Sequence, residues 1–130
     1  MLGVYRYSFC EIFARKILPS IKLYIAAKLV SDYGFTQLEA SRLLGVKQPL
    51  INYVLTGRRK PKYIELVERI PEVEAVVREF IDEIASRGRR ASSSGFICRL
   101  CRVFRDGELL DRVLGALGYS VDEVYIPEKP

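Results

Sequence analysis

The sequence predicts an all-α protein. Over most of its 130 residues, apolar side chains recur three or four positions apart instead of alternating, and that is the period of a helix. Glycines follow several of these runs, as at Gly34 and Gly45, and a proline opens another at Pro71. Because 49% of the residues are hydrophobic, the helices can close a common core.

Two helices are expected before residue 34. The first is a short one from about Phe9 to Leu18. Pro19 and Ser20 then predict a boundary, with Ser20 as the N-cap of a second helix that ends near Tyr33. Gly34 follows as a stop, since glycine adopts the left-handed backbone conformation at little cost.

A pair of short helices comes next. Thr36 and Glu39 form a capping box, in which each side chain satisfies a free backbone N–H, and the helix they open should end at Gly45. The following helix is expected at about 47–56. Pro49 lies in its first turn, where the missing N–H costs little.

Three more helices are predicted in the second half, at Pro61 to Ile70, from Pro71 onward, and from about Gly107 to Leu117. The helix that begins at Pro71 carries one apolar stripe at helical spacing. The stripe consists of Val73, Val76, Val77, Phe80, Ile81 and Ile84.

These elements suggest three parts. Residues 1–87 are expected to form a helical DNA-binding domain that contains the two short helices at 36–57. Residues 88–95, rich in Gly, Ser and Arg, are expected to be a flexible linker. Residues 96–130 then form a helical C-terminal extension, which we interpret as an assembly segment.

Charge is divided unevenly along the chain. The net charge is +5, but residues 1–62 hold eleven basic and three acidic residues, whereas the remainder is slightly acidic. A basic half favours a polyanionic partner. The chain contains no histidine, which excludes imidazole-based catalysis and imidazole ligands to a metal. No paired carboxylates or glycine-rich phosphate loop are visible, so no enzyme activity is expected.

A cytoplasmic protein is expected. No apolar run reaches the roughly 18 residues that cross a bilayer, so no membrane contact is predicted. The first residues also lack the pattern of a signal peptide.

The two short helices carry the most specific motif. It resembles the lambda-repressor-like, or Xre-type, helix-turn-helix from about Ile21 to Ile70, and the whole chain more loosely resembles predicted archaeal transcriptional regulators. Ser41, where the family usually has alanine, and Pro49 depart from the family pattern. The matching residues are Thr36, Gln37, Glu39, Ala40, Ser41, Leu44, Gly45, Val46, Gln48, Ile51, Val54, Gly57 and Arg58, continuing through Lys60, Pro61, Lys62 and Tyr63.

The resemblance implies a transcription regulator that binds double-stranded DNA specifically, with the helix at about 47–56 in the major groove. Gln37 is expected to bond a phosphate and to brace Gln48. Gln48 and Asn52 are expected at base edges, where an amide pairs with adenine. Tyr53 has an alternative role as a half-buried flank residue. The full expected DNA-binding set is Gln37, Lys47, Gln48, Pro49, Leu50, Asn52, Tyr53, Arg58, Arg59, Lys60 and Lys62, with the basic residues after the helix contacting phosphates.

A homodimer is expected, because regulators of this type bind two half-sites about 34 Å apart. Its interface would use the helix that begins at Pro71, the C-terminal segment, or both. The alternative for the apolar stripe is packing within its own chain.

The cysteines leave several possibilities open. Cys98 and Cys101 form a Cys-x-x-Cys motif, and with Cys10 they could hold zinc or an iron–sulfur cluster, although one chain offers at most three thiolates where zinc prefers four ligands. They are otherwise ordinary core residues or a redox disulfide. Two other functions therefore stay open: a protein-interaction module on the same fold without specific DNA binding, and a cysteine-based metal or redox sensor whose output is DNA binding.

Overall fold

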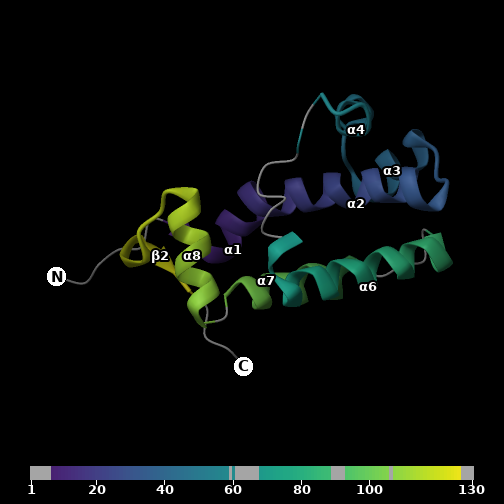
Figure 1. Ribbon diagram of the computed structural model, residues 1–130. Coiled ribbons are helices and arrows are strands. Elements are labelled where there is room, and N and C mark those ends of the chain that lie inside the picture. Colours follow the sequence, from purple (N-terminus) through teal and green to yellow (C-terminus); the bar gives the residue numbers. More distant parts are fainter. Residues whose placement is uncertain (1–6, 59, 61–67, 89–92, 106, 127–130) are drawn as a thin grey trace.

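A computed structural model describes residues 7–58, 60, 68–88, 93–105 and 107–126, and in them the chain is mostly helical (Figure 1). The helices are α1 (Phe9–Ile12), α2 (Leu18–Tyr33), α3 (Gln37–Leu44), α4 (Gln48–Leu55), α6 (Pro71–Arg87), α7 (Ser93–Phe104) and α8 (Gly107–Leu117). A π-helical turn, Phe13–Ile17, joins α1 to α2, and a 3₁₀ turn, Val121–Glu123, follows α8. The predominance of helix agrees with the expected all-α class.

Helix α2 is the centre of the packing. Its buried residues point in several directions around the helix axis, and a helix that is apolar around most of its circumference must be covered on several sides. In Figure 1, α3 and α4 lie on one side of α2, and α6 runs along the other. The buried residues of α2 are Leu18, Ile21, Leu23, Ile25, Ala26, Ala27 and Leu29.

The expected boundary at Pro19 and Ser20 is wrong. The chain stays helical from Phe9 to Tyr33, and Pro19 lies at the start of α2. The π-helical turn just before it accommodates the missing N–H of the proline, since Leu18 there donates to the carbonyl of Phe13, five residues earlier. This wider turn leaves room where a proline would disturb a regular α-helix.

Helix α6 confirms the predicted apolar stripe and shows what covers it. All six stripe residues are buried within the single chain, in one cluster with residues of α2 and α7. The rings of Phe80 and Phe96 stack with their centroids 4.0 Å apart. The stripe is therefore covered by the chain's own helices and is not an open surface for a second copy.

The segment expected to be a flexible linker, 88–95, is helical at its C-terminal end. Gly88 ends α6, and Ser93 to Gly95 already belong to α7. The stacking of Phe96 on Phe80 holds the beginning of α7 against α6, so a serine-rich composition did not keep residues 93–95 irregular. Buried residues on both sides of 88–95 belong to one core. Most of the helix expected at 61–70 lies outside the described residues.

A short sheet was not predicted. β1 (Tyr7–Ser8) pairs in parallel with β2 (Val124–Tyr125), with Tyr7 opposite Val124. The ring of Tyr7 also meets that of Tyr119 edge-on, with 5.1 Å between centroids. The pairing ties the C-terminal tail to the start of the chain. Two-residue strands give too little alternation to be recognised in a sequence.

Removing the ring at position 80 tests how strongly α6 and α7 depend on each other. We expect Phe80→Ala to lower the free energy of unfolding by about 3–5 kcal/mol, because it deletes a buried aromatic side chain and leaves a cavity beside Phe96. Urea denaturation measures the change. The control is Arg112→Ala at an exposed position of α8, expected within about 0.5 kcal/mol of the unmodified protein. A loss below about 1 kcal/mol for Phe80→Ala would contradict this packing.

Candidate nucleic-acid interface

The first short helix, α3, begins at the predicted capping box. The backbone N–H of Glu39 donates to Thr36 Oγ1 at 3.0 Å, and the N–H of Thr36 donates to Glu39 Oε1 at 3.1 Å. The hydrogen bonds with Thr36 lower the pKa of the Glu39 carboxyl below its usual 4.5. Only Ala40 and Leu44 of α3 are fully buried, and both join the core. The capping box thus fixes the residue at which α3 begins, and the burial of Ala40 and Leu44 fixes which face of the helix points to the core.

The turn between α3 and α4 is built by Gly45 and Ser41. Gly45 follows α3 in the left-handed conformation, with φ of 67°, as the sequence predicts. The hydroxyl of Ser41 donates across the turn to the carbonyl of Val46 at 2.6 Å. The serine that departs from the family pattern thus supplies a hydrogen bond that alanine could not, and it constrains the path of the chain into α4.

Helix α4 turns one face inward and leaves the other open. Pro49 is its second residue, as predicted, and only Ile51 is fully buried. Leu50, which was expected at the DNA, is half-buried and packs against the core. The other predicted residues on or next to α4 are exposed, namely Lys47, Gln48, Pro49, Asn52 and Tyr53.

Two amide side chains lie on the open face. Gln48 and Asn52 are four residues apart in α4 and therefore share one side of the helix. From α3, Nε2 of Gln37 donates to Oδ1 of Asn52 at 3.4 Å. The sequence-based expectation was that Gln37 would brace Gln48. Because both candidates share a face, only the crossing of the two helices decides which of them Gln37 reaches.

Basic residues surround this face. No acidic residue occurs between Ala40 and Lys60, whereas Lys47 precedes α4 and Arg58 and Lys60 follow it, all three exposed. The chain after α4 is held back against the helix, since the N–H of Arg58 donates to the carbonyl of Tyr53 at 2.9 Å. Arg59 and Lys62 of the predicted set lie outside the described residues.

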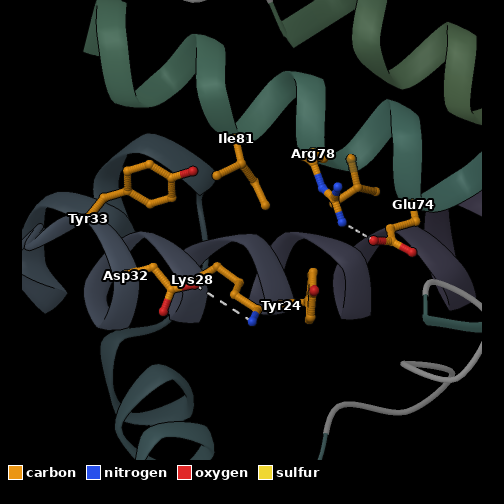
Figure 2. Close-up of a pocket in the computed structure, with 8 residues that line it drawn as sticks. Tyr24, Lys28, Asp32, Tyr33, Glu74, Arg78 and Ile81 are labelled. Atoms are coloured by element: carbon orange, nitrogen blue, oxygen red, sulfur yellow. Dashed lines mark hydrogen bonds and ion pairs between the residues drawn. The ribbon is translucent and has the colours of Figure 1, made fainter.

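A groove of about 190 Å³ lies between α2 and α6 (Figure 2). Charged side chains in and beside it already have partners within the chain: Lys28 pairs with Asp32 at 3.7 Å, and Arg78 pairs with Glu74. The hydroxyl of Tyr33 donates to Asp82 Oδ1 at 3.0 Å, and that hydrogen bond raises the pKa of the phenol. The two ion pairs each lie within one helix, and the hydrogen bond from Tyr33 to Asp82 crosses from α2 to α6. The groove therefore offers few unpaired charges to a ligand.

The three cysteines of the predicted metal site differ in their exposure to solvent. Cys10 and Cys98 are exposed, whereas Cys101 is buried, and within the described ranges no group of three or more Cys, Asp or Glu side chains is placed to hold a metal ion. Burial, together with the nearby Cys10 thiol, raises the pKa of Cys101 to about 12. The alternative of core packing fits Cys101, which lies beside Leu100 and Phe104 on the buried face of α7.

None of the helices in the described part of the chain is both long and apolar enough to cross a membrane. Comparison with models of protein families, with curated proteins and with solved structures gives no match.

The ionised Glu39 is expected to stabilise α3 in a pH-dependent way. Its pKa is lowered in the folded protein, so its contribution is present above about pH 4.5 and is lost as the pH falls through the folded-state pKa. Glu39→Gln should therefore melt at a lower temperature than the unmodified protein at neutral pH, with the difference shrinking as the pH falls below 4.5 through the folded-state pKa. Thermal melts across this pH range measure it, and a difference that stays constant would contradict the role of the carboxylate.

Proposed function

We propose that this protein is a sequence-specific DNA-binding transcription regulator that places the open face of α4 in the major groove, on a lambda-repressor-like helix-turn-helix. The observation that carries the proposal is the division of α4 into a buried side, centred on Ile51, and an exposed polar side with Gln48 and Asn52. Glutamine and asparagine amides are the side chains that pair with the N6 and N7 edge of adenine.

The hydrogen bond from Gln37 to Asn52 supports a role for Asn52 at the bases. It restricts the rotation of the Asn52 amide before DNA arrives, so less rotamer entropy is lost on binding. Gln37 lies at the first position of α3, where free backbone N–H groups also favour a phosphate. In this proposal Gln37 contacts a DNA phosphate and also holds Asn52 for its contact with a base.

The basic residues on either side of α4 supply the electrostatic part. Lys47, Arg58 and Lys60 are exposed, and no carboxylate interrupts the segment that contains them. Such residues position a protein on the phosphates without selecting a sequence. Sequence preference must then come from Gln48, Asn52 and the apolar edge at Pro49, which fits a thymine methyl group.

We further propose that two copies bind together. The eight residues of α4 span about 12 Å, which is enough to contact about three or four base pairs. So few base pairs cannot define a unique site in a genome, and a second recognition helix on an adjacent half-site overcomes this limit. Because the α6 stripe is covered within the chain, the contact between copies would use another surface.

Selection from a random duplex DNA pool tests the proposal. We expect an enriched inverted repeat with half-sites about one helical turn apart. Gln48→Ala and Asn52→Ala should each lose preference at particular base positions, by about 1–3 kcal/mol per lost amide pair. The control Arg112→Ala changes an exposed side chain on α8 and should select the same sequence.

Two outcomes of the selection would count against the proposal. If the folded protein enriches no sequence at moderate salt, specific DNA binding is excluded and the interaction-module alternative gains support. If a sequence is enriched but both amide variants select it unchanged, another surface makes the base contacts. A single enriched half-site would overturn only the binding of two copies.

Salt dependence tests the phosphate contacts separately. We expect Arg58→Gln and Lys60→Gln each to reduce the slope of log affinity against log salt by about 0.9, the value for one released counterion, while leaving the selected sequence unchanged. Arg112→Gln removes the same charge from α8 and should leave the slope intact. Fluorescence anisotropy with a labelled duplex at several salt concentrations gives these slopes. Equal slopes for all three variants would mean that the residues after α4 do not contact the phosphates.

A further inference from the structure

The N-terminal helix, which consists of α1 and the π-helical turn that follows it, meets α7 at one end of the core. The rings of Phe13 and Phe104 lie with centroids 5.9 Å apart, and both side chains are buried. Cys10 stands three residues before Phe13, and Cys101 stands three residues before Phe104. Side chains three apart share a face of a helix, so each thiol lies one turn from one of the two rings that make this contact.

The surroundings of the two thiols confirm that they are neighbours. After burial itself, the nearby Cys10 thiol is the largest influence on the pKa of Cys101, which it raises. The two cysteines differ in access, because Cys10 is exposed whereas Cys101 is 7% exposed. The Cys10 thiol is therefore accessible to solutes in water, whereas the Cys101 thiol is buried in the core.

We propose that Cys10 and Cys101 form a disulfide when the protein meets a two-electron oxidant of the peroxide class, and that this bond fastens the N-terminal helix to α7. The inference does not depend on DNA binding. It also differs from a disulfide within the Cys-x-x-Cys motif, because it joins two separate helices.

The chemistry proceeds in two steps. The exposed Cys10 thiolate attacks one oxygen of hydrogen peroxide, the O–O bond breaks, and after one proton is taken up the products are a sulfenic acid and water. The sulfur of Cys101 then attacks the sulfur of Cys10 and the S–O bond breaks. The leaving hydroxide takes the proton that Cys101 gives up, so two thiols and one peroxide yield one disulfide and two water molecules.

The pH dependence follows from the second step. Burial raises the pKa of Cys101 to about 12, so its thiolate is scarce at neutral pH and becomes more abundant as the pH rises. The attacking species is the thiolate. Cross-linking should therefore accelerate with rising pH after Cys10 has been oxidised.

Cys98 is the competing partner for Cys101, and helix geometry disfavours it. Side chains three residues apart on a helix have Cβ atoms about 5–6 Å apart, whereas a disulfide holds them at about 3.5–4.5 Å. Cys98 also faces solvent while Cys101 faces the core. Closing a bond between them would require α7 to distort, which a bond between neighbouring helices avoids.

Peptide mapping of the full chain after oxidation tests the proposal. The reduced protein is treated with a small excess of hydrogen peroxide, free thiols are alkylated, and the mass is measured. We expect one alkyl group, on Cys98, a loss of about 2 Da apart from that adduct, and a peptide that links Cys10 to Cys101. The bond closes a long loop, so the melting temperature should rise by at least about 5 °C and return on reduction.

Matched cysteine variants decide between the possible pairs. Cys98→Ser should still lose about 2 Da and gain thermal stability, whereas Cys10→Ser should do neither. Serine at position 10 replaces an exposed side chain, so this variant also shows whether folding is retained before oxidation. A Cys98–Cys101 link, a link between two chains, or sulfinic acid at Cys10 without any loss of 2 Da would each overturn the proposal.

Discussion

The burial of α2 on several sides is the constraint on which the rest of the structure depends. Its apolar residues are not confined to one stripe, so no single neighbour can remove them from water. Helices α3 and α4 cover one side and α6 covers another, and α6 in turn holds α7 through Phe80 and Phe96 (Figure 1). Because α4 covers α2 with one face only, the opposite face of α4 remains exposed to solvent.

Local signals made much of this predictable. The capping box at Thr36 and Glu39, the left-handed Gly45 and the early Pro49 each act within a few residues, and each is found where the sequence places it. The buried stripe of α6 was equally visible, because its spacing alone defines one face. The exposure of Gln48 and Asn52 followed from the same reasoning, once Ile51 was assigned to the core.

Other features depend on contacts between distant residues and could not be predicted. Pro19 was expected to end a helix, but a π-helical turn absorbs it within a packed helix. Ser93 was placed in a linker, although stacking of the nearby Phe96 holds the segment in α7. Gln37 was paired with Gln48 and is found with Asn52, because the angle between α3 and α4 is set by α2. The nearness of Cys10 to Cys101 likewise comes from packing, since 91 positions separate them in the sequence.

The central claim is that the open face of α4 meets DNA, and mapping the contact residue by residue tests it most directly. Isotope-labelled protein would be titrated with duplex DNA while the backbone amide resonances are followed by NMR. The account predicts that the largest shifts fall on the start of α3, on α4 and on the basic residues Arg58 and Lys60, with α6 and α8 little changed. Shifts centred on α6, α7 or α8, or none at all with DNA in excess, would contradict it.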